Sequence, residues 1–295
     1  MNANQFKGTG VALITPFRKD ESIDFNALER LVEKQIANKV NFLVALGTTS
    51  EAPTLSSDEK AAVVDFIIEI NKNRLPLVVG CGGNNTRDLV HQLRKYNGKA
   101  GVDGILSVAP YYNKPNQTGL YEHFKALANA CQLPIILYNV PGRTGSNIAA
   151  STAIKLAKNH KNIVAIKEAS GDFKQAMELV KHKPAGFLVL SGDDALALPL
   201  ISLGFDGIIS VVANAFPDEF SSMVNSALKG DFNQARTQHY RLIEIIHSLF
   251  EEGNPAGVKA YMVLNDAIEN SLRLPLVPVS KNLMERIKLL NKNLT

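Results

Sequence analysis

Lys167 is the residue whose position most clearly predicts chemistry. It directly follows the apolar residues 163–166, a run expected to pack inside the protein. Burial there penalises the charged ammonium and favours the neutral amine, which can attack a carbonyl carbon. The sequence therefore predicts a candidate nucleophilic lysine. A lysine that reaches solvent from a strand end, or that pairs with Glu168, is the alternative that this position leaves open.

Polar side chains follow other apolar runs in the same way. Tyr138 ends the preceding run, and its phenol can donate or accept a proton. Thr48 and Thr49 offer hydroxyls for a proton relay and backbone amides for an anion, although Gly-Thr-Thr is also ordinary turn chemistry. Arg143 can hold a carboxylate through two parallel hydrogen bonds. A buried tyrosine with a satisfied hydroxyl and a solvated loop arginine are the structural alternatives.

The sequence predicts neither a metal site nor a bound cofactor. Asp193 and Asp194 have no third acidic or histidine ligand at a recognisable spacing, so we expect them to organise loops by accepting hydrogen bonds. The glycine-rich residues 80–84 match neither phosphate-binding nor dinucleotide-binding loops. The histidines fall mostly in helix-like segments and end no apolar run, so we expect them on the solvated surface: His91, His123, His160, His182, His239 and His247.

Short apolar runs recur along the chain, each bounded by Gly, Pro or Asn and followed by a longer segment with helical spacing. Eight of them are expected to be strands, at residues 10–15, 42–46, 77–81, 104–108, 135–138, 163–167, 187–190 and 207–211. Their spacing of roughly thirty residues matches a strand and its covering helix, and continuous apolarity indicates strands buried on both faces. An open doubly wound sheet is the rival, but eight units without a dinucleotide fingerprint favour a closed TIM (β/α)8 barrel.

Strand signals stop after about Asp218, and the rest of the chain reads as helices. They are expected at residues 219–229, 232–251, 255–270 and 281–291. We therefore predict a barrel catalytic domain over residues 1–224 and a C-terminal helical extension over residues 225–295. In such barrels the active site lies at the carboxyl ends of the strands, where Lys167, Tyr138 and Thr48 are placed by this assignment.

The composition narrows the class of protein further. The 295 residues are 45% hydrophobic, enough for one barrel-sized domain with an appendage. The presence of only two cysteines indicates a reducing compartment. The lack of tryptophan and a net charge of +4 that is spread along the chain argue against a nucleic-acid surface. The N-terminus lacks the apolar core of a signal peptide, and no apolar run approaches the ~20 residues that span a bilayer. We expect a cytoplasmic protein without a membrane partner.

Six motifs occur in an order that resembles one known family. They are GVALITPF at 10–17, GTTSE at 47–51, PYYNKP at 110–115, YNVPGRTG at 138–145, IKEA at 166–169 and SGDD at 191–194. Together they resemble the dihydrodipicolinate synthase and N-acetylneuraminate lyase superfamily. The resemblance continues to the C-terminal region, so it covers essentially the whole chain.

The resemblance implies a pyruvate lyase of the Schiff-base type. It implies that Lys167 forms a covalent imine with pyruvate and that no separate cofactor is needed. Tyr138 matches the family's proton shuttle, aided by Thr48 and by Tyr112, which in the family reaches in from a neighbouring subunit. This detail implies a homo-oligomer, a tetramer built from dimers.

The substrate contacts are implied in the same way. Thr49 matches the ligand of the pyruvate carboxylate and Ile209 a backbone contact to it, while Gly192 lines the pocket. Arg143 matches the contact to the carboxylate of the second substrate, aspartate 4-semialdehyde. This arginine favours synthases, because the sialic acid lyases of the superfamily tend to lack it. Ser50 and Gly142 depart from the family's commoner residues and carry no chemistry.

Two other functions stay open at the sequence level. Another pyruvate-dependent aldolase, acting on N-acetylneuraminate or a 2-keto-3-deoxy sugar acid, would share Lys167 and Tyr138. A non-catalytic ligand-binding barrel is the alternative of a different class, since fold does not dictate function. Family members that are inhibited by lysine bind it at an interface near the positions of Ala52, Leu55, Lys60, Asn84, Asp88 and Tyr111. Sensitive members often carry histidine or glutamate where this chain has Lys60, so weak or absent inhibition by lysine is expected.

Overall fold

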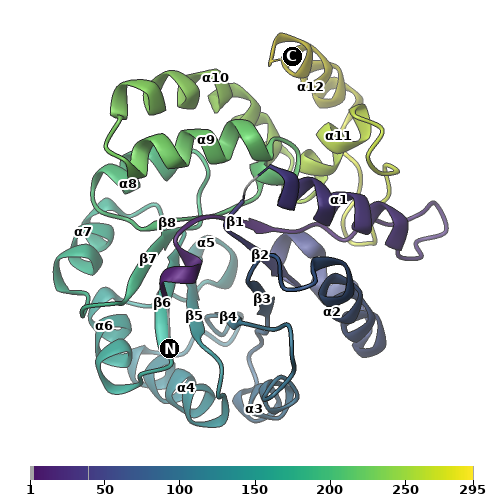
Figure 1. Ribbon diagram of the computed structural model, residues 1–295. Helices are drawn as coiled ribbons and strands as arrows, with labels where there is room; N and C mark the ends of the chain where they lie inside the picture. The colour runs from purple at the N-terminus through teal and green to yellow at the C-terminus, as the bar shows by residue number, and fades with distance from the viewer. Residues whose placement is uncertain (1–2, 39, 295) are drawn as a thin grey trace.

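The computed structural model describes residues 3–38 and 40–294, and its strands form one closed barrel (Figure 1). All neighbouring strands are parallel, and the ring closes where β1 pairs with β8. The strands are β1 (Gly8–Ala12), β2 (Phe42–Ala45), β3 (Leu77–Gly80), β4 (Gly104–Val108), β5 (Ile135–Asn139), β6 (Ile163–Glu168), β7 (Leu188–Ser191) and β8 (Gly207–Ser210). The predicted (β/α)8 barrel is therefore confirmed, and the open sheet is excluded.

Glycine makes the closure between β1 and β8 possible. Gly8 pairs with Gly207, and a Cβ atom on Gly207 would lie 2.1 Å from the carbonyl oxygen of Gly8. The backbone of Gly207 also has a φ of +146°, which only glycine adopts readily. Because pairing starts at Gly8, β1 begins two residues before the predicted range of 10–15. Beyond its end, the Leu13 N–H still donates to the Val44 carbonyl at 2.9 Å.

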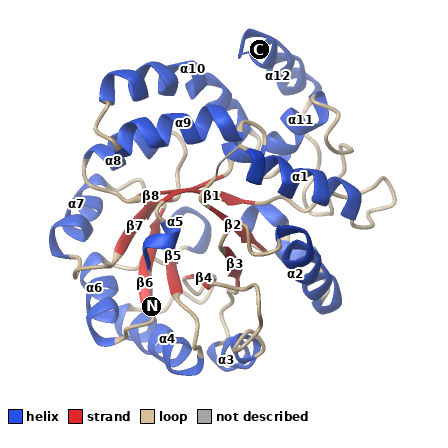
Figure 2. Cartoon of the chain, in the orientation of Figure 1, coloured by secondary structure: helices blue, strands red, loops and turns tan. Residues whose placement is uncertain are grey.

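Helices surround the strands on the outside, as Figure 2 shows in blue and red. The helices are α1 (Phe25–Ala37), α2 (Ser57–Asn71), α3 (Thr86–Arg94), α4 (Gln117–Ala130), α5 (Pro141–Thr144), α6 (Ala150–Asn159), α7 (Phe173–His182), α8 (Ala197–Ser202), α9 (Pro217–Leu228), α10 (Phe232–Glu251), α11 (Ala256–Leu264) and α12 (Lys281–Leu294). Short 3₁₀ turns lie at η1 (Ala3–Phe6), η2 (Thr48–Ser50), η3 (Ala52–Thr54) and η4 (Val212–Asn214). No helix among the described residues is long and apolar enough to cross a membrane.

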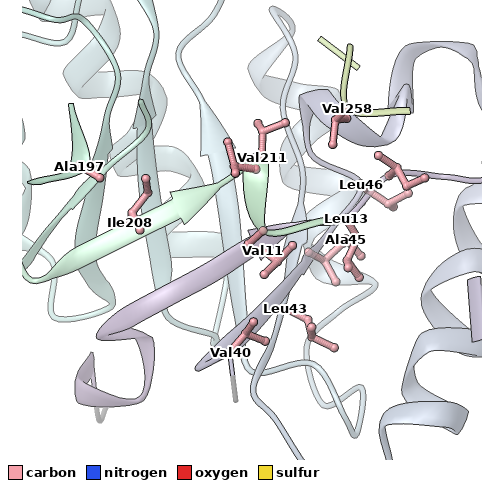
Figure 3. Close-up of a cluster of buried hydrophobic side chains, with 14 of the residues drawn as sticks. Val11, Leu13, Val40, Leu43, Ala45, Leu46, Ala197, Ile208, Val211 and Val258 are labelled. Atoms are coloured by element: carbon pink, nitrogen blue, oxygen red, sulfur yellow. The ribbon is translucent and has the colours of Figure 1, made fainter. Parts of the chain in front are cut away.

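The alternation of side chains along the strands divides the core into two layers. One layer fills the barrel, with side chains such as Phe42, Val44 and Ile209. The other lies between the strands and the helices, and Figure 3 shows part of it, including Leu43 of β2 and Val258 of α11. Both faces of each strand are thus buried, which is why the strands are continuous apolar runs in the sequence.

The C-terminal helices follow the prediction with one clear exception. Helix α10 has the predicted bounds, and α9 and α12 differ from theirs by a few residues. Helix α11, predicted to reach residue 270, ends at Leu264 because Asn265 caps it and Asp266 takes a left-handed conformation with a φ of 51°. The predicted boundary between residues 224 and 225 lies within α9 and stays a prediction. Helix α11 lies between α12 and α1 in Figure 1, and the Arg30 guanidinium of α1 donates to the carbonyl of Ala267, just after α11, at 3.2 Å.

Candidate active site

A β-bulge turns Lys167 into the barrel. Ile135 of β5 pairs with Ile163, but the next residue, Ile136, pairs with Ala165, so β6 contains one extra residue at this point. Ile163 packs in the layer outside the barrel, and Val164 and Ala165 both pack inside it. Strict alternation from Ile163 would have pointed Lys167 outward. The extra residue reverses the alternation and directs Lys167 to the interior.

Lys167 and Tyr138 lie together at the carboxyl ends of their strands. The two residues are register partners across β5 and β6, and the Lys167 Nζ atom lies 4.3 Å from the centroid of the Tyr138 ring. Their exposed fractions are only 5% for Lys167 and 6% for Tyr138. An amine that is held against a phenol and screened from water is suited to attack a carbonyl with a proton carrier at hand.

Glu168 does not neutralise Lys167. Its buried carboxylate accepts hydrogen bonds from the Asn139 side chain at 3.0 Å, the Ser170 N–H at 2.7 Å and the Gln175 side chain at 2.9 Å. Among the ion pairs of residues 3–38 and 40–294, none includes Lys167. The alternatives of a paired or solvent-reaching lysine are therefore wrong, and the amine is left for chemistry.

Gly192, after β7, gives the lysine stem the space it occupies. A Cβ atom at this position would lie 2.7 Å from the Cβ of Ala169 and 2.9 Å from the Cε of Lys167. Both distances are shorter than real Cβ contacts, so any side chain here would displace Lys167 or the segment after β6. Gly192 thus forms the wall along which the lysine extends, and its role in lining the substrate pocket stays a prediction.

Thr48 and Thr49 lie in the 3₁₀ turn η2, at the end of β2. Thr49 is buried, and its hydroxyl accepts a hydrogen bond of 3.0 Å from the side chain of Asn254. Thr48 is partly exposed and faces a cleft of about 1430 Å³ that is lined by residues following β2 to β5 and extends between α2 and α3. Tyr138, Arg143 and Asn254 line the same cleft. A hydroxyl, a phenol and a guanidinium therefore face one space.

Arg143 and Ile209 occupy opposite environments. Arg143 is exposed on the short helix α5, which begins two residues after the end of β5, so its charge stands at the mouth of the cleft. Ile209 is fully buried in β8 inside the barrel. Its chain is held by Asp194, whose carboxylate accepts hydrogen bonds from the Ser210 hydroxyl and from the Val211 N–H.

Asp193 and Asp194 organise loops, as predicted. Asp193 accepts from the N–H groups of Ala195 and Leu196 at 2.9 and 3.2 Å. Asp194 is fully buried, and the loss of solvation raises the pKa of its carboxyl to about 6. Among the described residues, no group of three or more histidine, cysteine or acidic side chains is arranged to hold a metal ion.

Tyr112 is the predicted site residue that the chain does not bring to Lys167. Its side chain is 87% exposed and absent from the cleft lining, whereas the preceding Tyr111 lines the cleft. The backbone of Tyr112 has a φ of 66°, and its N–H donates to the Thr144 carbonyl at 3.3 Å. The segment is thus fixed next to α5 with the phenol directed outward.

The prediction for the histidines was wrong at two positions. His123 and His239 are buried, with 5% and 7% exposed. The Nδ1 atom of His123 lies 2.8 Å from the Thr86 hydroxyl, and burial lowers the pKa of this imidazole to about 4. Both residues lie on the inward faces of helices α4 and α10, because they fall at helical spacing with apolar neighbours such as Leu127 and Leu242. This spacing was the signal that could have identified them.

Sequence reasoning assigned no role to the residues that contact the Thr48 turn from the C-terminal region. Asn254 reaches Thr49, and Glu51 directly follows the turn and forms a buried ion pair with Lys259 of α11. The pair is separated by more than two hundred residues in sequence, so no local pattern links it. In the sequence, Lys259 is visible only as a charge within an apolar segment, and Glu51 only as the charge that ends a polar segment.

The fold and this constellation define a class: a closed (β/α)8-barrel enzyme with a buried lysine and tyrosine at the carboxyl ends of β5 and β6. The chain belongs to the dihydrodipicolinate synthetase family, whose model matches residues 5–293.

Relatives that are named as enzymes resemble the chain over nearly its whole length. It is 51% identical to the 4-hydroxy-tetrahydrodipicolinate synthase of Parabacteroides distasonis, covering 96% of this chain and 95% of the relative. It is 53% identical to the enzyme of that name from Azobacteroides pseudotrichonymphae, covering 96% and 95%. The chloride-inhibited dihydrodipicolinate synthase from Acinetobacter baumannii, solved with pyruvate, superposes with a TM-score of 0.94 at 41% identity, covering 98% of both chains.

Proposed function

We propose that this protein is a lyase that condenses pyruvate with L-aspartate 4-semialdehyde to 4-hydroxy-tetrahydrodipicolinate, a step of diaminopimelate and lysine biosynthesis. Membership of the family and the relatives at about half identity support the reaction. The observation that carries it is the buried Lys167 amine lying 4.3 Å from the Tyr138 ring centroid, next to a cleft with Arg143 at its mouth.

The reaction begins when the Lys167 amine attacks the ketone carbon of pyruvate and water leaves, giving a protonated imine. The positive imine withdraws electrons from the methyl group, which then loses a proton to form an enamine. The enamine carbon adds to the aldehyde of the second substrate, whose oxygen takes up a proton. Finally, the amine of the bound product attacks the imine carbon, closes the ring and displaces Lys167. Because the imine accepts the electrons, the chain needs no separate cofactor.

The proton steps fall to hydroxyl groups around Lys167. Tyr138 lies against the amine and is assigned the proton shuttle, with Thr48 across the cleft as its partner. The third hydroxyl of the relay is assigned to the partner subunit's Tyr112. An exposed tyrosine on a fixed segment is suited to reach a neighbouring molecule, whereas it contributes nothing to the site of its own chain.

The two substrate carboxylates have separate binding groups. Thr49 and the backbone of Ile209 are assigned to the pyruvate carboxylate, near the wall formed by Gly192. Arg143 is assigned to the carboxylate of aspartate semialdehyde, because a guanidinium at the mouth of the cleft binds a carboxylate through two hydrogen bonds. We further assign the chain to a homotetramer built from dimers, and to the cytoplasm.

The decisive experiment is reduction with borohydride in the presence of pyruvate, followed by mass spectrometry of the peptides. A pyruvate adduct on Lys167 is expected in the native protein and none in Lys167→Ala, whose turnover should fall by about 10³ or more. An unmodified native lysine contradicts the proposal. Assays of condensation with aspartate semialdehyde against cleavage of N-acetylneuraminate and 2-keto-3-deoxy acids identify the second substrate; faster cleavage of a sugar acid would favour another aldolase of the superfamily.

A further inference from the structure

A buried ion pair ties the C-terminal helices to the active-site turn. Glu51 and Lys259 have fully buried side chains, and the Lys259 Nζ atom lies 2.5 Å from the Glu51 Oε1 atom. Glu51 directly follows the turn η2, which carries Thr48 and Thr49, and Lys259 lies in the middle of α11. The pair therefore connects two segments that are far apart in sequence, at the base of the turn.

The backbone at Glu51 indicates that its charge, and not local preference, fixes the turn. Glu51 has a φ of 56° and a ψ of 33°, the left-handed region in which glutamate is strained and glycine or asparagine is favoured. The surrounding contacts hold it there. Besides Lys259, the Glu51 carboxylate accepts a hydrogen bond of 3.0 Å from the backbone N–H of Arg273. As the residue between η2 and η3, left-handed Glu51 sets the direction in which the chain leaves the Thr48 turn.

Other contacts converge on the same segment. Lys259 also donates to the Ser271 carbonyl at 3.0 Å, and its Nζ atom lies 4.4 Å from the centroid of the Phe17 ring. Arg273 stacks on the same ring at 4.5 Å and donates to the Thr54 carbonyl at 3.0 Å. Asn254, just before α11, reaches the Thr49 hydroxyl. The segment from 254 to 273 thus contacts the turn at Thr49, Glu51 and Thr54.

Lys259 is not a second nucleophile. Its side chain is fully buried, and its ammonium is occupied by the carboxylate of Glu51 and the carbonyl of Ser271, so the amine is not available to attack a carbonyl. Nor is stability a sufficient reason for the pair, because burying two charges costs solvation that their attraction about offsets, and apolar side chains of similar size often stabilise as much. What an ion pair provides beyond apolar packing is a defined geometry for the groups attached to it.

We propose that Glu51 and Lys259 are positioning residues for the pyruvate site, holding the Thr48–Thr49 turn so that its hydroxyl and amide groups meet the substrate carboxylate. The inference rests on the proposed function, since it assigns a purpose to the turn in that reaction. It also gives the C-terminal extension a part in catalysis: α11 supplies the cation that fixes a loop of the barrel.

The test replaces both charges at once, because removing one would leave the other buried and unpaired. In the double variant Glu51→Gln with Lys259→Met, both side chains keep their length and neither is charged. We expect the KM for pyruvate to rise about tenfold and kcat to fall by only a few fold, because the turn that carries Thr49 and the relay hydroxyl of Thr48 loses its fixed geometry while Lys167 and Tyr138 are untouched. Thermal unfolding, followed in parallel, checks that the assays are made on folded protein.

A matched control removes an ion pair of the same extension that lies away from the turn. Glu251→Gln with Arg286→Met breaks a pair between α10 and α12 and should leave the KM for pyruvate unchanged. If the double variant at Glu51 and Lys259 does not fold, the single variant Glu51→Asp, which keeps both charges but shortens the reach of the carboxylate towards Lys259, should still raise this KM by a few fold. A KM equal to that of the native protein in the folded variant overturns the inference.

Borohydride trapping separates this outcome from failure of the proposed function. The folded double variant should still form the pyruvate adduct on Lys167 at saturating pyruvate, at a concentration higher than the native protein requires. If the native protein forms no adduct, the proposed reaction is wrong. If it forms the adduct and the variant needs no more pyruvate than the native protein, only the positioning role is wrong.

Discussion

At the scale of single residues, the space beside Lys167 is as important as the lysine itself. The stem of Lys167 runs along Gly192, where an added Cβ atom would lie 2.9 Å from its Cε and 2.7 Å from the Cβ of Ala169. The flexible Lys167 side chain can shift, but the Cβ atom of Ala169 is fixed in place by its backbone. Any substitution at Gly192 must therefore shift the lysine or the backbone that carries it.

Gly192→Ala should lower kcat/KM by about 10- to 100-fold, because a displacement of the nucleophile by a few tenths of an ångström degrades its alignment with the ketone. The protein should remain folded, since one methyl group adds a cost of about 1–3 kcal/mol. Steady-state assays and the rate of adduct trapping measure the effect. Gly142→Ala is the matched control, because no atom lies within 4 Å of a Cβ there and native kinetics are expected. Native kinetics in Gly192→Ala would contradict the argument.

What the sequence predicted of these residues depended on strand ends. Lys167 and Tyr138 were identifiable because each ends an apolar run, and the structure places them together. The roles of Asn254 and Glu51 were not identifiable, because their partners lie across the fold; Glu51 was noted only as part of the GTTSE motif. Burial of His123 was missed because a polar residue at a helix position was taken as solvated, although its spacing from Leu120 and Leu127 placed it on the inward face.

At the scale of elements, the direction of each strand's side chains decides which residues reach the site. The sequence predicted the position of β6 but not its bulge, because an extra residue in one strand is visible only against its partner. The prediction that Lys167 enters the barrel was therefore correct in outcome, although simple alternation from Ile163 would have turned it outward. The end of α11 was also not predicted, since the left-handed conformation of Asp266 leaves no mark in the pattern of apolar residues.

The connection between β7 and β8 depends on the buried carboxyl of Asp194, which predicts a pH effect. Its pKa is raised to about 6 from 3.8 by the loss of solvation. The folded state therefore holds the proton more tightly than the unfolded state does. The stabilising contribution is complete below about pH 4, declines as the pH rises through 6, and is gone above it, a change on the order of 3 kcal/mol.

Urea unfolding of the native protein and of Asp194→Asn at pH 4, 5, 6 and 7 tests this prediction. The amide resembles the protonated acid in shape and does not titrate, so all other titrating groups cancel in the difference between the two proteins. The native protein should have its greatest advantage over the variant at pH 4 and a smaller one at pH 7. A difference that stays constant over this range would show that Asp194 does not titrate in the fold.

Helix α2 lines the cleft on the side where the lysine effector site is expected, and we predict that inhibition by lysine is weak. Ala52, Lys60, Asp88 and Tyr111, four of the positions expected for that effector, line the cleft together. A cationic effector there meets the charge of Lys60, which opposes its binding. Lys60→Glu should therefore lower the concentration of L-lysine that halves the rate by about tenfold.

Inhibition curves of the native protein, Lys60→Glu and Lys19→Glu measure this effect. Lys19 is an exposed residue outside the cleft lining, so its replacement makes the same change in net charge without touching the site. Its inhibition curve should match that of the native protein. Strong inhibition of the native protein by submillimolar lysine, or equal curves for all three proteins, would contradict the prediction.

At the scale of the whole molecule, the repeating spacing of the strands predicted the closed ring, because eight parallel units with both faces buried have few other ways to satisfy their edges. The sequence alone did not predict how the ring closes, which depends on the approach of Gly8 to Gly207. Nor does one chain account for every predicted site residue: Tyr112 is exposed and directed away from the cleft. The proposed relay, in which the partner subunit's Tyr112 supplies a hydroxyl, therefore requires that the protein form an oligomer.

Mixing two inactive proteins tests whether the site is shared between subunits. Tyr112→Phe keeps Lys167, and Lys167→Ala keeps Tyr112, so each should have little activity alone. In a mixed dimer, the subunit that keeps Lys167 receives the tyrosine of its partner and regains one complete site. After dissociation and random reassembly of equal amounts, half of the dimers are mixed and about a quarter of the native activity should return.

Reassembly of Lys167→Ala with Tyr138→Phe is the control, because these residues face each other in one chain and no mixed dimer restores both to one site. If the Tyr112 mixture stays as inactive as this control, or if Tyr112→Phe alone retains native turnover, each chain works with its own residues and the shared site is wrong.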